Sequence, residues 1–256
     1  MTYNTIGLRI EGNMAVVQLQ RPEKLNAVSL EMAIELRHVL AQIQTSDTLR
    51  VLLLTGAGRA FCAGADLSDP GTQTADVLTE QFNPLVRALA DFPFPIVAGI
   101  NGAAVGIGCS IALMADIVMA GQSAYFLQTF ARVALAPDGG ASWSLPKLIG
   151  LPRAKAMLLL GDRITAAQAE EWGLIYRAVS DDRLSSEAAA LASRLADGPT
   201  YALGITRRGL HASLEQGLDE ALAREAADQA AAAMSSDHKE AVAAFLAKRP
   251  VSFAGR

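Results

Sequence analysis

The 256-residue sequence predicts an α/β fold with a mostly parallel β-sheet and a helical C-terminal region. Three observations predict it. Up to about residue 141, short apolar segments of strand length alternate with segments of helical periodicity. Glycine-rich loops at 56–67 and 102–108 each follow one of the apolar strand segments. The last third of the chain is Ala-rich and helical in pattern. The repeated order of strand, glycine-rich loop and helix can build a stacked spiral rather than one flat sheet.

The N-terminal elements follow from local patterns. Residues 6–12 and 14–20 predict a β-hairpin, because Gly12 and Asn13 between them suit a tight turn. Residues 29–44 have apolar side chains at helical spacing, with Ser29 as the N-cap. The other predicted elements of the core are buried strands at 50–56 and 95–101, an apolar helix at 109–115 and short strands at 116–121 and 124–128.

The pattern becomes helical from Ser142 onward, and only residues 175–179 are predicted to form a strand. The predicted helical segments are 154–161, 165–173, 185–198, 218–234 and 238–249. Few turns are rich enough in Gly or Pro to be flexible linkers. We therefore expect a core at residues 1–195 and a helical region at 196–256 that packs on the core or on a neighbouring subunit.

The composition excludes several classes of function. A net charge of −4 without a basic run argues against nucleic-acid binding, which requires clustered Lys and Arg. The chain contains only two cysteines and opens without a signal-peptide pattern, so we expect a reducing, cytoplasmic location. Residues 94–121 are apolar, but Asn101, Ser110 and Asp116 interrupt them. This segment therefore favours a buried strand, loop and helix over a membrane span.

The two glycine-rich loops are candidate sites for a developing oxyanion. A glycine-rich turn at the start of a helix presents unpaired backbone N–H groups, and two such loops could direct two donors to one oxygen. Glycines that only form tight turns remain an alternative at this stage. A dinucleotide site is disfavoured, because Ile111 stands where the fingerprint begun by Gly106 and Gly108 requires its third glycine.

Two carboxylates, Asp66 and Asp138, are the candidates for a catalytic acid or base. The three histidines (38, 211 and 238) lie on polar faces of predicted helices, where we expect them to be solvated. No pattern of metal-ligand spacing and no nucleophile elbow is found in the sequence, so no metal is expected. Asp66 ends the first loop, and Asp138 follows an apolar segment and precedes Gly139 and Gly140. Either carboxylate could be a helix N-cap. For Asp138, the sequence is equally consistent with an N-cap and with a catalytic residue.

These motifs together resemble the enoyl-CoA hydratase/isomerase (crotonase) superfamily along the whole chain. The matching segments are RPEKLNAVS (21–29), GAGRAFCAGADL (56–67), NGAAVGIGC (101–109), PDGGASWSLPKLIG (137–150), ITAAQAEEWGLIYRAV (164–179) and AFLAKR (244–249). The resemblance implies a spiral of ββα units with a helical C-terminal trimerisation region, assembled as a homotrimer or homohexamer. It also implies an acyl-CoA thioester as substrate, with coenzyme A part of that substrate and no separate cofactor.

The resemblance assigns roles to individual residues. The backbone donors of the oxyanion hole fall on Ala65 and Ile107, and the bulk of Ile107 is expected to narrow the acyl pocket. An aromatic and a basic residue that contact CoA across a subunit boundary match Phe245 and Lys248. The other implied substrate-binding residues are Lys24, Leu25, Ala63, Gly64, Asp66, Leu67, Gly106, Gly108 and Phe130.

The departures from the family pattern predict the reaction. The two glutamates with which hydratases of the family hold water are Ser110 and Phe130 here, and neither is a general base near neutral pH. Asp138 stands where isomerases of the family have their acid/base aspartate. Phe130 and Phe126 are expected to exclude water and to raise the pKa of Asp138. The resemblance therefore implies an isomerase rather than a hydratase.

Within the superfamily, the chain is most similar to the isomerases of aerobic phenylacetate breakdown, which act on 2-(1,2-epoxy-1,2-dihydrophenyl)acetyl-CoA. A related enoyl-CoA double-bond isomerase, or a hydratase-like enzyme of other specificity, is an alternative. An aryl-CoA dehalogenase with a nucleophilic aspartate is another, although Phe130 replaces its tryptophan and only Asn83 and Arg87 stand where its histidine is expected. A non-catalytic CoA- or RNA-binding member is the third alternative.

Overall fold

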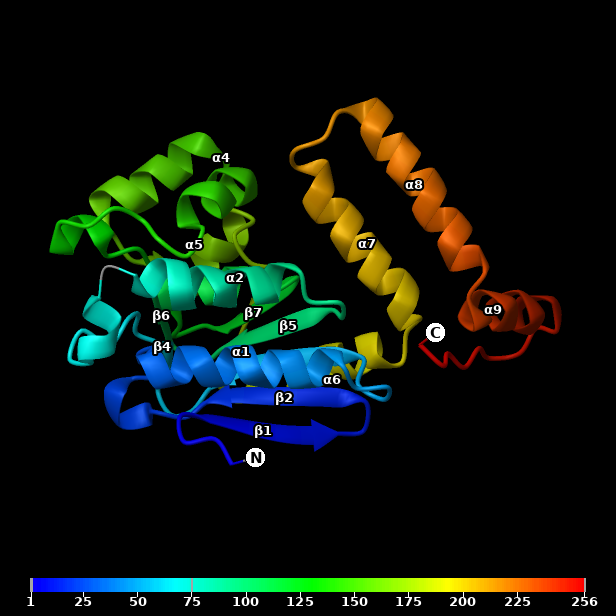
Figure 1. The fold of residues 1–256 in the computed structure, drawn as a ribbon, viewed down its shortest axis with the longest axis horizontal. Coiled ribbons are helices and arrows are strands. Elements are labelled where there is room, and N and C mark those ends of the chain that lie inside the picture. The colour runs from blue at the N-terminus through cyan, green and yellow to red at the C-terminus, as the bar shows by residue number, and fades with distance from the viewer. Residues whose placement is uncertain (1, 75, 256) are drawn as a thin grey trace.

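Two β-sheets form the centre of the protein in a computed structural model that describes residues 2–74 and 76–255 (Figure 1). The larger sheet has six strands in the order β1-β2-β3-β5-β7-β10, and the smaller has four in the order β4-β6-β8-β9. The strands are β1 (Ile6–Glu11), β2 (Met14–Leu19), β3 (Val51–Gly56), β4 (Ala60–Cys62), β5 (Ile96–Ile100), β6 (Ala103–Val105), β7 (Ile117–Gly121), β8 (Tyr125–Leu127), β9 (Ile164–Thr165) and β10 (Arg177–Val179). The α-helices are α1 (Leu30–Gln44), α2 (Asn83–Ala90), α3 (Ile107–Leu113), α4 (Ala141–Leu160), α5 (Ala166–Glu171), α6 (Asp181–Ala196), α7 (Thr200–Ser213), α8 (Leu218–Ala233) and α9 (Ser236–Leu246).

The strand pairing confirms the predicted α/β class. Strands β1 and β2 form an antiparallel hairpin, and the pairs β2–β3, β3–β5, β5–β7 and β7–β10 are parallel. Successive strands alternate between the two sheets, since β3, β5 and β7 belong to the larger sheet and β4, β6 and β8 to the smaller. This alternation is the spiral of ββ units that the resemblance implies.

The glycine-rich segments are not simple loops, and here the sequence-based expectation was wrong. Each of the two contains a three-residue strand, β4 in the first and β6 in the second, and these strands pair with each other in parallel. Three residues are too few to show a periodicity, so the pattern along the sequence could not reveal them. They carry the ends of both loops to the same place in the fold.

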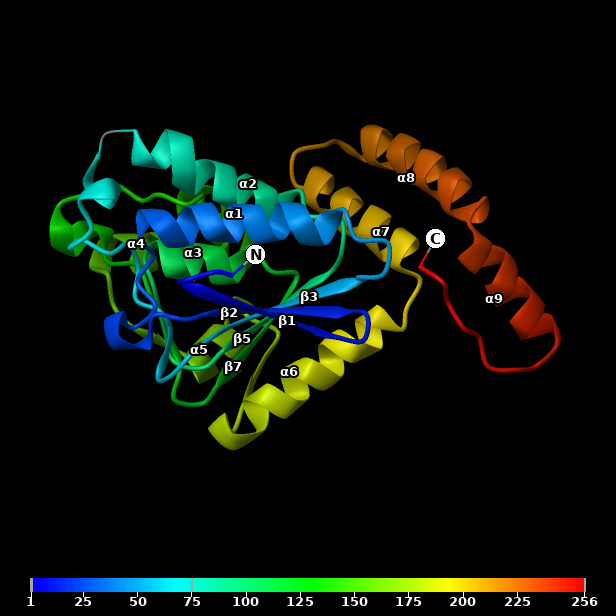
Figure 2. The same ribbon diagram turned by 60° about the horizontal axis from the view of Figure 1, so that its bottom comes forward.

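Helices cover both faces of the larger sheet (Figures 1 and 2). Helix α6 packs on one face through Leu184 and Ala188, against Leu53 and Val97 of β3 and β5. The opposite face, with Leu52 and other alternate strand residues, belongs to the core that includes residues of α1, α2 and α3. Side chains on both faces of the central strands are therefore buried, which explains their continuous apolar sequences.

The C-terminal region extends from the core. Helix α7 lies beside α8, while α9 is far from α4 and from the β4 end of the sheets in both views (Figures 1 and 2). The predicted boundary after residue 195 falls in the last turn of α6. A two-residue strand, β9, pairs with β8 in a part of the chain that was expected to be helical. The strand predicted at 175–179 is shorter than expected, since β10 includes only its last three residues. None of the helices in the described part of the chain combines the length and apolar character of a membrane span.

A buried arginine fastens α7 to the core. The Nε of Arg207 donates to the two carboxylate oxygens of Asp116 at 2.6 and 2.8 Å. Its two terminal nitrogens donate to the carbonyl oxygens of Leu89, Ala90 and Phe92, each at 2.6 Å. The Arg207 side chain is only 4% exposed, so these partners replace the water it has lost.

We expect Arg207→Met to lower the free energy of unfolding by about 3 kcal/mol, because it leaves the charge of Asp116 unpaired, with only the N–H of Ile96 as a remaining donor within the described part of the chain, and removes a donor from three carbonyl groups. Urea denaturation monitored by circular dichroism measures this. Arg208→Met, at the exposed neighbouring position, is the matched control and should change stability by less than about 0.5 kcal/mol. Equal stability of the two variants would contradict the anchoring role.

Candidate active site

The two glycine-rich segments meet at Gly64 and Gly106. Both residues have positive φ, +106° and +51°, which favours glycine. A Cβ at Gly64 would lie 3.3 Å from the carbonyl oxygen of Val105, and a Cβ at Gly106 would lie 4.0 Å from the Cα of Gly64. The absence of side chains therefore lets the two backbones approach one another closely.

This approach places two unpaired backbone donors beside each other in the fold. The bridge to Val28 uses the carbonyl of Gly64 and the N–H of Asp66, at 2.7 and 2.9 Å, so the N–H of Ala65 between them points away from that bridge. Ile107 is the first residue of α3, where N–H groups have no partner within the helix. In residues 2–74 and 76–255, no acceptor receives a hydrogen bond from either N–H. Both are free to bind an oxygen of a ligand.

Asp66 is not a helix N-cap, and no α-helix begins directly after the first loop. A 3-10 helix at Pro70–Gln73 follows instead, and its N-cap is Asp69. The carboxylate of Asp66 accepts from the hydroxyl of Ser68 at 2.6 Å and from Arg21 at 2.8 Å. These partners, with Ser68 the larger cause, hold the pKa of Asp66 at about 2 despite its burial. Asp66 is therefore a charged structural residue of the loop.

Asp138 does not cap the helix that follows it. Gly140 is the N-cap of α4, and no side chain forms the cap hydrogen bond. The Oδ1 atom of Asp138 is buried and has no hydrogen-bond partner among the described residues. Burial raises the pKa of Asp138 from 3.8 to about 6. A half-buried carboxylate whose buried oxygen has no partner is costly to stability, which is typical of functional sites.

The turn that carries Asp138 lies on the first turn of α3. Gly139 has φ +59°, and a Cβ there would collide with Cδ1 of Ile107 and lie 2.8 Å from Cβ of Ser110. The hydroxyl of Ser110 also donates to the carbonyl of Asp138 at 3.4 Å. The turn formed by Asp138 and Gly139 therefore packs against Ile107, the residue that begins α3. The side chain of Ile107 is 2% exposed and packs against this turn, so the expectation that it narrows an open acyl pocket finds no support.

The predicted CoA-binding residues near the first loop are brought together. The Nζ of Lys24 lies 3.3 Å from the hydroxyl of Ser68, and the N–H of Ala63 donates to the carbonyl of Leu25 at 3.0 Å. Leu67 is 62% exposed. A cavity of about 460 Å³ lies here, lined by Arg21, Lys24, Ser29, Leu30, Glu31, Asp66, Ser68 and Asp69. Arg21 and Ser68 were missed as site residues, although Arg21 opens the RPEKLNAVS motif.

Other predicted residues lie in different surroundings. Phe130 is buried on a 3-10 turn eight residues before Asp138 in the chain. Phe245 and Lys248 are exposed at the end of α9, remote from β4 and α4 of the same chain (Figure 1). Of the histidines, His211 was wrongly expected to be fully solvated: it is half-buried, and desolvation lowers its pKa.

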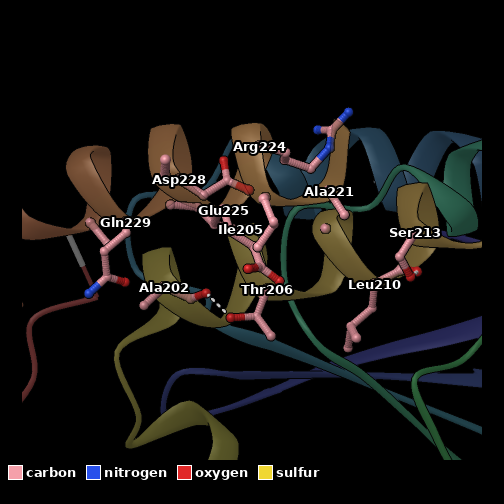
Figure 3. A pocket seen from close by; sticks show the side chains of 14 residues that line it. Ala202, Ile205, Thr206, Leu210, Ser213, Ala221, Arg224, Glu225, Asp228 and Gln229 are labelled. Carbon is pink, nitrogen blue, oxygen red and sulfur yellow. Dashed lines mark hydrogen bonds between the residues drawn. The ribbon is translucent and has the colours of Figure 1, made fainter. Parts of the chain in front are cut away.

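A cavity of about 720 Å³ between α7 and α8 is separate from this site (Figure 3). Its labelled side chains come only from these two helices, and none of the residues that line it belongs to the two loops or to the Asp138 turn. The hydroxyl of Thr206 donates to the carbonyl of Ala202 at 2.8 Å within α7. The chemistry of the two free donors and Asp138 is therefore independent of this cavity.

Two free backbone donors near a partly desolvated carboxylate are a combination typical of enzyme sites that act on carbonyl substrates. The family model of enoyl-CoA hydratase/isomerase matches residues 9–256, and the chain belongs to this family. The "1,2-epoxyphenylacetyl-CoA isomerase" of Escherichia coli (strain K12) is 41% identical over 96% of this chain and 97% of its own. A "Probable enoyl-CoA hydratase" of Rhodobacter capsulatus is 42% identical over the full length of both. The crystal structure of an enoyl-CoA hydratase from Bacillus anthracis has a TM-score of 0.93 at 29% identity, covering 99% of this chain and 100% of that one.

The raised pKa of Asp138 predicts how stability depends on pH. Well below pH 4 the carboxyl is neutral in both folded and unfolded chains, whereas between about pH 4 and 6 it is mostly ionised only in the unfolded chain. The wild-type protein should therefore lose stability as the pH rises through this window. Asp138→Asn removes this loss, so its stability relative to wild type should rise by about 1–3 kcal/mol between pH 4 and pH 7.

Urea denaturation of both proteins at several pH values measures this difference. Asp162→Asn is the control, since the Asp162 side chain is 70% exposed. A stability difference that stays constant from pH 4 to pH 7 would contradict the burial of the Asp138 carboxylate.

Proposed function

We propose that this protein is an acyl-CoA isomerase in which Asp138 moves the proton. The observation that carries the proposal is the buried, unpartnered Oδ1 of Asp138 on a turn that packs against Ile107. A carboxylate without internal partners is available to a substrate proton. A pKa of about 6 leaves it ionised at neutral pH and still able to hold a proton transiently.

The proposed reaction needs one carboxylate and two donors. Ionised Asp138 removes a proton from the α-carbon of the acyl group, and the electron pair of the broken C–H bond moves onto the thioester carbonyl to form an enolate. The N–H groups of Ala65 and Ile107 stabilise the negative oxygen, a contribution of about 3–4 kcal/mol for each such donor. The protonated Asp138 then returns the proton to a different carbon, and the carbonyl re-forms.

Hydration is the less supported alternative. Adding water to a double bond requires groups that hold and split the water, and the family positions for those groups are Ser110 and Phe130. The hydroxyl of Ser110 is buried, and its one proton is shared between the carbonyl oxygens of Gly106 and Asp138, each 3.4 Å away. Phe130 offers no acid or base. Of Ser110, Phe130 and Asp138, only Asp138 can act as a base near neutral pH, which suits transfer of one proton within the substrate.

For the substrate, we propose 2-(1,2-epoxy-1,2-dihydrophenyl)acetyl-CoA. The similarity to the 1,2-epoxyphenylacetyl-CoA isomerase of Escherichia coli supports it. Isomerisation of this substrate would open the ring epoxide. A 3-enoyl-CoA substrate tests whether the enzyme also shifts the double bond of an ordinary enoyl-CoA. A panel of ring-epoxide, 3-enoyl and 2-enoyl CoA thioesters, followed by mass and product analysis, distinguishes these substrates. A mass gain of one water on a 2-enoyl-CoA at comparable rate would contradict the isomerase proposal.

We expect Asp138→Asn to lower kcat by about 10²–10⁴-fold, since it removes the acid/base but keeps the shape of the side chain. Incorporation of solvent deuterium into the substrate should fall in parallel. Wild-type kcat/KM should fall as the pH drops below about 6, because Asp138 must be ionised to accept a proton. Steady-state assays and mass spectrometry in D₂O measure these effects.

Binding of acyl-CoA to Asp138→Asn, measured by calorimetry, separates lost chemistry from lost binding. Asp162→Asn is again the matched control. Full isomerase activity in Asp138→Asn would overturn the proposal, and a covalent adduct on Asp138 in the wild-type protein would favour the dehalogenase alternative.

We also propose that α8 and α9 pack on a second copy of the chain, in a trimer or a pair of trimers. Their exposed apolar side chains support this, because isolated domains rarely expose so many. These residues are Leu218, Leu222, Met234, Val242, Phe245 and Leu246. Phe245 is 82% exposed and remote from the site of its own chain, as a residue that acts on a neighbouring subunit must be.

Phe245→Asp should weaken the assembly and raise the KM for acyl-CoA several-fold, because it places a charge in a buried contact and removes a ring from the substrate site. Native mass spectrometry and steady-state kinetics measure the two effects. Glu240→Asp, on the same helix, is the control. An unchanged assembly and an unchanged KM would exclude this role of α9.

A further inference from the structure

We propose that the side chain of Ile107 is a positioning residue, which holds the Asp138 turn in place and excludes water from its carboxylate. This inference rests on the proposed function, in which the backbone N–H of the same residue binds the thioester oxygen. It goes beyond that function, which uses only the backbone of Ile107 and is indifferent to its side chain.

The geometry of Gly139 carries the inference. Gly139 has φ +59° and follows Asp138 directly, and the nearest atom to its absent Cβ is Cδ1 of Ile107. Cβ and Oγ of Ser110 are the next nearest, at 2.8 and 2.9 Å. Ile107 and Ser110 are three residues apart in α3, so they share one helix face. The turn therefore lies on a surface formed by these two side chains.

Of these two side chains, Ile107 supplies the apolar part. It is 2% exposed and belongs to the main hydrophobic core, so its packing is fixed by its neighbours. Ser110 holds the carbonyl of Asp138 through a long hydrogen bond of 3.4 Å, which constrains the backbone only weakly. Contact with Ile107 is the closer constraint on the turn.

Burial, rather than a neighbouring charge, sets the raised pKa of Asp138. The pKa of its carboxyl is raised by desolvation alone. The charged groups on the neighbouring elements are Arg87 on α2, Arg132 on the 3-10 turn, and Lys147, Arg153 and Lys155 on α4; none of them contributes to the shift. The thiols of Cys62 and Cys109 are buried, and desolvation raises the pKa of each to about 12, so both are neutral. The apolar atoms around the turn therefore decide whether water reaches the carboxylate.

Removing the far end of Ile107 tests the inference. We expect Ile107→Ala to lower kcat about 10-fold with KM within about 2-fold, since a displaced general base costs rate more than binding. The acidic limb of the kcat/KM profile should move down by about one pH unit, because water then reaches Asp138. Ile107→Leu, which retains an apolar end, should restore both. Ile107→Val is the variant to use if Ile107→Ala does not fold.

Leu113→Ala is the matched control, because Leu113 lies in the same helix but lines a separate cavity with Trp143 and His211. It should lose stability without moving the pH profile. A profile for Ile107→Ala or Ile107→Val that stays at the wild-type position would overturn the inference, whatever the loss of stability.

A second readout does not depend on the proposed reaction. Between pH 4 and pH 7, Asp138→Asn should gain stability relative to the protein that retains Asp138. This gain should be smaller when both proteins also carry Ile107→Ala. The same gain in both backgrounds would overturn the inference. Activity that survives Asp138→Asn, together with a smaller gain in the Ile107→Ala background, would instead reject the proposed function and leave the positioning role supported.

Discussion

The contact between Gly139 and the first turn of α3 is the constraint on which the site depends. It brings the chain segment that precedes α4 against the segment that begins α3, although β7 and β8 separate the two segments in the sequence. A side chain at position 139 would force these two segments apart, and the positive φ there independently favours glycine. Packing therefore holds the turn that carries Asp138 against the first turn of α3, which carries the N–H of Ile107.

The rest of the fold supports this contact by placing α3 precisely. Helix α3 begins one residue after β6, and β6 pairs with β4, so the Ala65 and Ile107 donors each lie a few residues after one of two neighbouring strands of the smaller sheet. Gly108 is in contact with Cys62: a Cβ at Gly108 would lie 2.5 Å from the Sγ of Cys62. Close backbone approach thus recurs at each step from β4 to the Asp138 turn. Small residues are required along this path because any added atom would separate the donors from the carboxylate.

The sequence predicted the large elements well and the small ones poorly. Buried strands such as Val51–Gly56 and helices such as Leu30–Gln44 have enough residues to show their patterns. Strands Ala60–Cys62 and Ala103–Val105 are too short for this, and their pairing depends on contacts distant in sequence. Asp138 and the glycines were found because a carboxylate among apolar and glycine residues is unusual. The ion pair of Arg21 with Asp66 could not be found, since only the fold brings these residues 2.8 Å apart.

The same physics explains why the two aspartates next to the loops differ. Asp66 and Asp138 both follow apolar segments, and either could have been a cap on sequence grounds. Hydrogen bonds from Ser68 and Arg21 stabilise the charge of Asp66, so its pKa falls to about 2 and it cannot exchange protons near neutral pH. Asp138 has burial without such partners, so its pKa rises to about 6. A proton carrier must be able both to lose and to regain its proton, and the absence of stabilising partners gives Asp138 that property at a cost in stability. Contacts remote from the site, such as the five hydrogen bonds of Arg207, offset that cost without touching the chemistry.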